Sequence, residues 1–350
     1  MKFTSQKKYF SPYQATDSFF SEEEFRSTYQ QSKENILRSI TPDGYGEYTK
    51  LVDFLHSLKN SQLVPVKDLM CENKDGKKMI AIRFDIDQEP FTAIRLARFN
   101  ARFGIPSSFY LLHTAYYYGQ MKDGVFHRNP LMRSWIKSMI VAGCEIGLHN
   151  DALSLYKTYK IDGAQAIIEE IKWLRLQEVK IFGTAAHNSF PVYGAENFEV
   201  FKDHLMWKRN KAETNKNNYD LGVLDEKSLD LVYEANFPKP VSDLRALSRK
   251  RQIKNWLRIT DGSSVESSTW MRTYLVDNPC YKRAHDVTVW HHGNDKWSIG
   301  INRDMVFKKY WFWKIDRQHM FQLIKNLPEN TRIIFHLHPI YFSKDTMGTL

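Results

Sequence analysis

Two aspartates, Asp85 and Asp87, are the side chains best placed to do chemistry, because they end a short apolar run at residues 79–86. The run is typical of a buried strand, and side chains two apart on a strand point the same way. The two carboxylates should therefore lie together at the carboxyl end of a strand, where α/β proteins gather ligands. One of them could cap the helix expected from about residue 91, but a helix needs only one cap. The pair predicts a site that binds a metal or moves a proton.

Histidines occupy the same position in three other predicted strands. If the strands are parallel, their carboxyl ends meet at one rim of the sheet. One aspartate and two histidines with an open position are a common ligand set for a catalytic zinc ion. A single histidine of this kind is more often an ordinary core or loop residue, so the shared position carries the prediction of a metal centre. The histidines are His149, His187, His336 and His338.

The elements that must position these residues alternate between strand and helix from residue 79 onwards. Helices are expected at about 91–103, 130–142 and 163–177. This alternation predicts an α/β fold with a parallel, barrel-like sheet. Residues 1–78 are polar, with helices expected at 22–40 and 48–59, and form an N-terminal helical extension to a main domain at 79–350. The expected strands are 79–86, 106–112, 144–149, 179–186, 221–224, 256–260 and 332–337.

Composition limits the classes of function. The chain has 350 residues and a net charge of +10, but its Lys and Arg are scattered and no zinc-finger or helix-turn-helix spacing occurs, so no nucleic-acid partner is expected. The charge favours an anionic substrate or peripheral contact with an anionic membrane surface. Three widely spaced cysteines suit a reducing compartment, and no apolar run reaches the roughly 18 residues of a membrane span. A cytoplasmic location is expected.

The order of the motifs resembles the polysaccharide deacetylase superfamily, which is carbohydrate esterase family 4 with NodB homology. It is most similar to the divergent branch associated with bacterial surface-polysaccharide biosynthesis. The resemblance covers roughly residues 79–345 and implies a distorted (β/α)7 barrel. It also implies a hydrolase that removes an acetyl group from an acetylated sugar with one divalent metal ion, expected to be zinc. The motifs are Phe-Asp-x-Asp at 84–87, Glu-Ile-Gly-Leu-His at 145–149, His-Asn-Ser at 187–189 and His-x-His-Pro at 336–339.

The resemblance implies roles for the strand-end residues. Asp85 matches the general base, and Asp87 and His149 match metal ligands. The family has a further histidine four residues after His149, where this chain has Leu153. We expect His187 to be the third ligand in its place. Asp151 is the second candidate for that position.

The remaining candidates concern the leaving group and the substrate. His338 matches the family histidine that protonates the leaving amine, and His336, two residues earlier, is expected near the substrate. Asn188 stands where the family commonly has an arginine that orients the base. With Tyr193 and Asp261 it is expected to bind the substrate, which would be an N-acetylated sugar of a polysaccharide precursor. An Asp-Gly pair at a strand end, such as Asp261 with its following glycine, is more often an ordinary turn.

Two questions stay open at the level of sequence. Leu153 and Asn188 replace groups that the family uses, so a catalytically inactive barrel that binds sugar or organises a biosynthetic complex is the alternative function. Metal content would separate the two hypotheses. The adjacent His291 and His292 are expected in a loop, because neighbouring residues on a strand face opposite ways. The oligomeric state and the particular sugar are not predicted.

Overall fold

The computed structural model describes most of the chain. The described residues are 10–18, 22–38, 42–71, 73, 75–187, 197–202, 221–235, 274–275, 286–304 and 309–343. Three predicted substrate-binding residues, Asn188, Tyr193 and Asp261, lie outside them, as does the predicted strand at 256–260. No helix in the described part is both long enough and apolar enough to cross a membrane.

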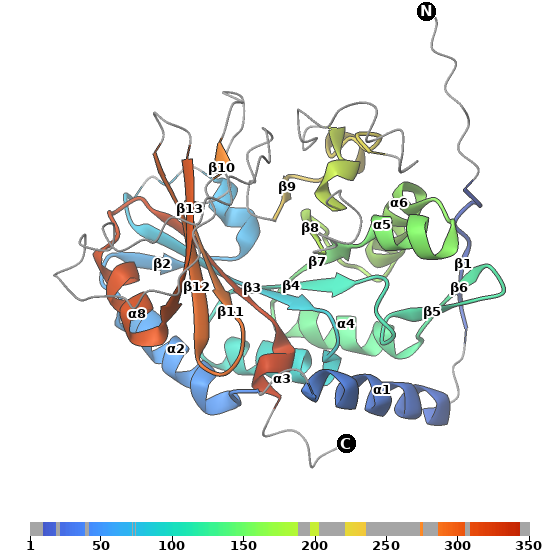
Figure 1. The fold of residues 1–350 in the computed structure, drawn as a ribbon, viewed down its shortest axis with the longest axis horizontal. Helices are drawn as coiled ribbons and strands as arrows, with labels where there is room; N and C mark the ends of the chain where they lie inside the picture. Colours follow the sequence, from blue (N-terminus) through green and yellow to red (C-terminus); the bar gives the residue numbers. More distant parts are fainter. Residues whose placement is uncertain are drawn as a thin grey trace, which may run out of the picture.

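Seven neighbouring parallel strands make up most of the main sheet (Figure 1). Because they are parallel, their carboxyl ends lie at one edge of the sheet. The central ones are buried along their whole length, as expected of parallel strands covered on both faces. In spatial order they are β11 (Val287–His291), β14 (Arg332–Leu337), β3 (Lys78–Ile86), β4 (Ser107–Leu112), β7 (Glu145–Asn150), β8 (Gly183–Ala186) and β9 (Tyr233–Glu234).

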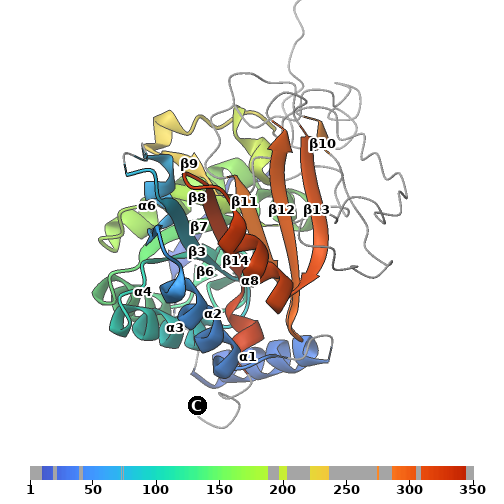
Figure 2. The same cartoon turned by 90° about the vertical axis from the view of Figure 1, so that its left-hand side faces the viewer.

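Antiparallel strands extend this sheet beyond β11. They are β12 (Lys296–Asp304), β13 (Lys309–Asp316) and the short β10 (Tyr274–Leu275). Figure 2 shows β12 and β13 as the outermost long strands. Within the described residues, no strand pairing joins β10 to β9 at the two ends of the sheet. The predicted α/β class is confirmed.

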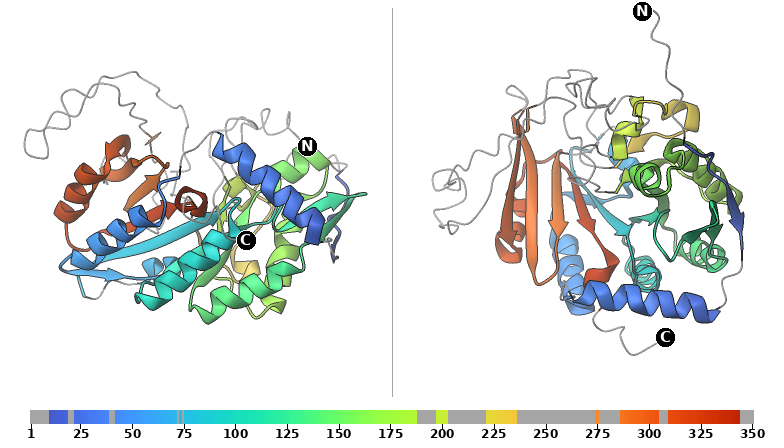
Figure 3. Two further views of the ribbon diagram at one scale, coloured as in Figure 1. Left: turned by 90° about the horizontal axis from the view of Figure 1, so that it is seen from below. Right: turned by 45° about the vertical axis from the view of Figure 1, so that its right-hand side comes forward.

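Helices cover the sheet and are held by aromatic contacts. Phe25 of α1 contacts Phe91 of α3 and Trp135 of α4, so α1 lies across both helices (Figures 1 and 3). Phe54 of α2 stacks on Phe321 of α8 with ring centroids 3.9 Å apart. The described helices are α1 (Glu22–Leu37), α2 (Tyr45–Ser57), α3 (Pro90–Arg102), α4 (Leu131–Val141), the short α5 (Ala152–Ser154), α6 (Gly163–Leu176) and α8 (Arg317–Asn326).

Single turns and a small second sheet complete the described fold. The small sheet joins β1 (Ala15–Asp17), β6 (Val125–Arg128) and β5 (Gly119–Lys122). The turns are η1 (Val66–Met70), the π-helical η2 (Leu155–Tyr159), η3 (Asn197–Val200), η5 (Lys227–Leu229) and η6 (Pro339–Phe342).

Residues before position 79 pair with the main sheet and pack against one of its helices. The strand β2 (Ser61–Leu63) pairs in parallel with the start of β3. The hydroxyl of Tyr48 on α2 donates to Asn100 on α3 at 2.6 Å, inside the core. The domain boundary at 78/79 stays a prediction, but the segment before it contributes a strand and core side chains.

One predicted strand is wrong. Residues 221–224 form only an isolated bridge, between Phe201 and Leu224. The parallel strands that follow β8 in the chain are instead β9 and β11. A two-residue strand such as β9 shows no periodicity, so sequence pattern alone cannot locate it.

Candidate metal centre

The carboxyl end of β3 holds Asp85 and Asp87, and the neighbouring strands bring histidines to them. His149 comes from β7, and His187 follows β8, where its backbone N–H donates to the carbonyl of Asn150. His336 lies on β14 and His338 follows that strand directly. The structure thus gathers six predicted residues at one edge of the sheet, in two groups.

The first group consists of Asp87, His149 and His187. One ligand atom from each lies within 4.8 Å of the others. The Nε2 atom of His149 is 3.2 Å from Oδ1 of Asp87. Two ligands about 2.1 Å from a tetrahedral zinc ion lie about 3.4 Å apart, so this spacing fits a shared ion. These are the three residues that the sequence predicts as metal ligands.

The hydrogen bonding of His149 also fits a cation. Its Nδ1 atom is 2.7 Å from the carbonyl oxygen of Ala185, which can only accept, so Nδ1 carries the proton. A neutral ring then points the lone pair of Nε2 at the carboxylates of Asp87 and Asp85, 3.2 and 3.4 Å away. That contact is favourable only with a positive charge between them, which is either a proton or a metal ion. A metal-binding histidine commonly has such a carbonyl on its other nitrogen.

Asp87 carries the clearest sign of a missing partner. Its Oδ1 atom is buried and has no hydrogen-bond partner among the described residues. Burial alone would raise the pKa of this carboxyl, but His338 and His149 outweigh that effect and lower it to about 2. Asp87 is therefore a fixed negative charge whose Oδ1 atom accepts no hydrogen bond from the described residues, with Nε2 of His149 3.2 Å away. The donor set of one carboxylate and two imidazoles suits zinc or a similar divalent ion.

The carboxylates around His187 change its pKa. Burial would lower its pKa, but Asp151 and Asp87 raise the pKa of His187 to about 9. The pocket thus favours a positive charge at this ring. A divalent ion would compete with that proton, since ligands must lose their protons to bind a metal.

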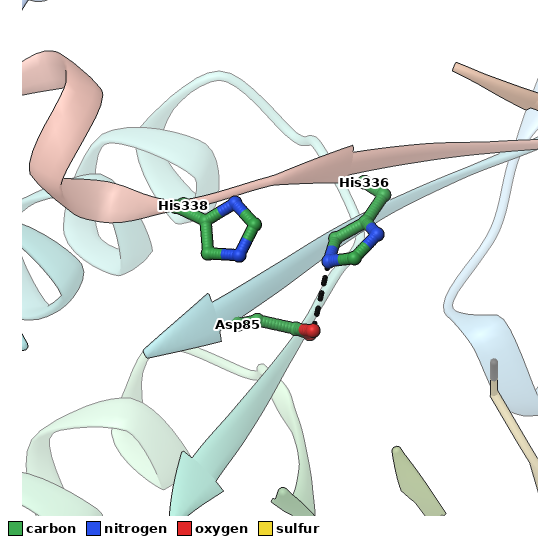
Figure 4. Close-up of side chains that lie close together, drawn as sticks. All are labelled: Asp85, His336 and His338. Carbon is green, nitrogen blue, oxygen red and sulfur yellow. Dashed lines mark hydrogen bonds and ion pairs between the residues drawn. The ribbon is translucent and has the colours of Figure 1, made fainter. Parts of the chain in front are cut away.

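The second group consists of Asp85, His336 and His338, again with ligand atoms within 4.8 Å of one another. Figure 4 shows the Asp85 carboxylate directed at His336, with His338 beside it on the same chain segment. The Nε2 atom of His336 is 2.8 Å from Oδ2 of Asp85. The Nε2 atom of His338 is 3.4 Å from Oδ2 of Asp87, so this histidine lies between the two groups.

Arg83 gives the second group a fixed positive charge that the first group lacks. The sequence motifs did not point to this residue. It precedes Asp85 by two residues on β3, so both side chains lie on one face. Its Nε and Nη2 atoms donate to Oδ1 and Oδ2 of Asp85 at 2.7 and 2.5 Å, and both residues are at most 2% exposed. Nη1 donates to the carbonyl of Ala235 beyond β9. The signal was present in the sequence as an arginine inside an apolar strand.

A glycine in the second motif makes room for this arrangement. The Arg83 guanidinium lies over the ring of Tyr110, 5.3 Å from its centroid. A Cβ atom at position 147 would come within 2.5 Å of the same ring, so only glycine fits there. The Tyr110 hydroxyl is hydrogen-bonded to the hydroxyl of Tyr233 at 2.7 Å. The position of Arg83 beside Asp85 therefore rests on the packed rings of Tyr110 and Tyr233.

The acid–base properties of the second group follow from burial and from Arg83. Burial alone would raise the pKa of Asp85, but Arg83, His149 and His336 hold it well below its usual range. Burial lowers the pKa of His336 to about 3 and also lowers that of His338. At neutral pH the group is an ionised carboxylate beside two neutral imidazoles.

Neither position 153, where the resembled family has its histidine, nor Asp151, the second candidate for the third ligand, supplies a ligand atom to the first group. The Leu153 side chain is fully buried in the core. Asp151 lies on the far side of His187, with its Oδ2 atom 3.4 Å from Nδ1 of that ring. His291, expected in a loop, ends strand β11 instead and is hydrogen-bonded to Asp43 at 2.6 Å.

Comparison with known proteins adds no family to this geometry. A scan against protein-family models and a search of curated proteins both find no match. Any assignment of function therefore rests on the chemistry of the site and on the order of the sequence motifs.

Proposed function

We propose that this chain is a metal-dependent hydrolase that removes the acetyl group from an N-acetylated sugar of a surface-polysaccharide precursor. The observation that carries the proposal is the pairing of two groups at one sheet edge. Asp87, His149 and His187 can hold a divalent ion, and Asp85, His336 and His338 can move protons beside it. The motif order supports the sugar deacetylase class over other metal hydrolases.

The fold is in keeping with this class. Seven neighbouring parallel strands, with the helices α3, α4 and α6 between β3, β4, β7 and β8 along the chain, support a distorted (β/α)7 barrel for the main domain. The carboxyl ends of its strands form the rim where barrel enzymes place their active sites. Both groups of residues lie at that rim.

The residues of the second group divide the proton transfers. Asp85, kept ionised by Arg83, accepts a proton from the attacking water. His338 is neutral before the reaction, so it must gain a proton before giving one to the departing amine nitrogen. Asp85, His336 and His338 lie within 4.8 Å of one another, which lets the proton taken from water reach the leaving group. A divalent ion, when bound, supplies Lewis acidity toward the acetyl carbonyl and the water.

The test is acetate release from N-acetylated oligosaccharides by zinc-loaded protein. Asp85→Asn should reduce the rate by about 10²–10⁴-fold, because the base is lost, while the metal content stays at one equivalent. The matched control is Asp123→Asn, at the exposed turn between β5 and β6 of the small sheet. Metal loss in Asp85→Asn but not in Asp87→Asn would reverse the two assignments.

The second candidate function is a sugar-binding barrel without activity. The observation in its favour is Leu153, which sits buried in the core where a ligand would be expected. Wild-type protein that binds the oligosaccharide but neither takes up a divalent metal nor releases acetate would replace the enzyme by this alternative.

A further inference from the structure

Asp151 is a buried carboxylate that the proposed mechanism does not use. It is 3% exposed and lies just after β7, next to the short helix α5. Its backbone N–H donates to Nε2 of His113 at 2.8 Å, which fixes the main chain at this point. The side chain turns toward His187, with Oδ2 at 3.4 Å from Nδ1.

Both oxygens of Asp151 have further donors. Asn197 Nδ2 donates to Oδ1, and Thr114 Oγ1 donates to Oδ2, each at 2.9 Å. The carboxylate is therefore held from two sides while it faces His187. A carboxylate that ligated an ion directly would have to give up at least part of this bonding. Its place is behind the imidazole.

Asn197 ties this carboxylate to the ring that it faces. Besides Asp151, its Nδ2 atom donates to the backbone carbonyl of His187 at 2.8 Å. Its Oδ1 atom accepts from the backbone N–H of Leu153 at 2.9 Å. Asn197 is fully buried, so it fixes the end of β7 and the residue after β8 to each other.

We propose that Asp151 is a positioning residue for His187, and that Asn197 and Thr114 hold it in that role. The Nδ1–H of His187 would donate to Asp151, which leaves Nε2 with its lone pair for the ion. Carboxylate partners of this kind fix the tautomer and orientation of a histidine ligand and raise its basicity. A third ligand from the next strand thereby takes the place of a side chain at position 153. This inference rests on the metal centre of the proposed function.

The experiment measures metal binding rather than activity. Zn²⁺ affinity is determined by competition with a chromophoric chelator, and the Co²⁺-loaded protein is followed by its visible absorption. Asp151→Asn should weaken Zn²⁺ binding about 10–100-fold, as loss of an outer-shell partner does, and keep the Co²⁺ spectrum at saturation. His187→Ala should weaken binding more and change the spectrum. Asp123→Asn should do neither.

Thr114→Val is the second variant if Asp151→Asn fails to fold. It keeps the carboxylate but removes one of its donors, so affinity should fall by less than in Asp151→Asn with the spectrum unchanged. Wild-type affinity in either folded variant would overturn the inference. So would a Co²⁺ spectrum changed in Asp151→Asn as strongly as in His187→Ala, because Asp151 would then be a ligand.

The outcomes also separate this inference from the proposed function. Wild-type protein that binds neither Zn²⁺ nor Co²⁺ overturns both. Protein that binds the metal with the predicted pattern of variants but releases no acetate keeps the inference and removes the deacetylase. Protein that releases acetate, with metal affinity insensitive to Asp151→Asn and Thr114→Val, does the reverse.

Discussion

The two halves of the pocket contain the same residue types, one aspartate and two histidines, but they hold their aspartates in opposite ways. Both carboxylate oxygens of Asp85 accept hydrogen bonds from Arg83, and one of them is also hydrogen-bonded to His336. Asp87 keeps a buried oxygen without a hydrogen-bond partner among the described residues. The Asp85 group already contains the fixed cation Arg83, and we call it the closed half. The Asp87 group has no arginine, only the proton that its carboxylates favour on His187, and we call it the open half. A metal ion can replace that proton but cannot replace Arg83.

This difference also favours one bound ion over two. A buried carboxylate is stable only with a compensating charge, and Arg83 supplies that charge to Asp85. A divalent ion at Asp85 would lie next to the guanidinium and be repelled by it. At Asp87 the same ion would meet a carboxylate that has no arginine partner, and it would only have to displace the proton of His187. The residue types alone predict two equivalent sites, whereas the charges make them unequal.

The largest effect on Zn²⁺ affinity should come from removing the charge of Asp87 in the open half. Asp87→Asn should lower Zn²⁺ affinity by more than the roughly 100-fold that loss of an outer-shell partner can cost, because a direct anionic ligand is lost. Chelation should then leave the thermal midpoint of this variant unchanged. In the wild type, metal at 100 times its Kd should stabilise the fold by about 2.7 kcal/mol, measured by thermal unfolding with and without chelator. Equal shifts in both proteins would contradict the assignment of Asp87.

The closed half should respond in stability rather than in metal affinity. Arg83→Met leaves the Asp85 carboxylate buried without its partner, and breaking a buried pair in this way costs about 3–5 kcal/mol. Adding Asp85→Asn to that variant removes the stranded charge and should restore part of the loss. Urea unfolding of the metal-free single and double variants measures this. A fold unaffected by Arg83→Met would mean that the two halves are not held differently.

Much of the pocket could be predicted because its signal is local. Asp85 and Asp87 end an apolar run, and His149 and His187 come at the ends of two later strands in the chain. Parallel pairing then brings all of them to one edge. The pattern of side chains along each strand was enough, because the strands β3, β4, β7 and β14 each contain an apolar run.

What could not be predicted depends on partners far away in sequence. Strand β11 pairs with β14 and β12 on its two sides, so His291 ends a strand although the adjacent histidines were expected in a loop. The position of Asp151 behind His187 depends on Asn197, 46 residues later. Arg83 is different. Its position two residues before Asp85 was visible, but its role required the knowledge that this strand is buried on both faces.

The smallest expected loss in the free energy of unfolding concerns Asp43. This residue connects the N-terminal segment to the chain beside the closed half. Its backbone N–H donates to the carbonyl of Tyr341 in the turn after His338, and its carboxylate bonds to His291 at 2.6 Å. Burial would raise its pKa, but the bonds from His291 and from the Asp295 backbone lower it. A lowered pKa stabilises the fold above the unfolded value near 3.9, and this stability is lost as pH falls through the folded pKa. Asp43→Asn should therefore cost about 1.5–3 kcal/mol at pH 7, and its deficit should shrink once the pH drops below about 4. Urea unfolding of both proteins from pH 7 to pH 3 tests this, with Asp123→Asn as the control, and a deficit that grows in acid would show that the Asp43 carboxylate does not carry the contact.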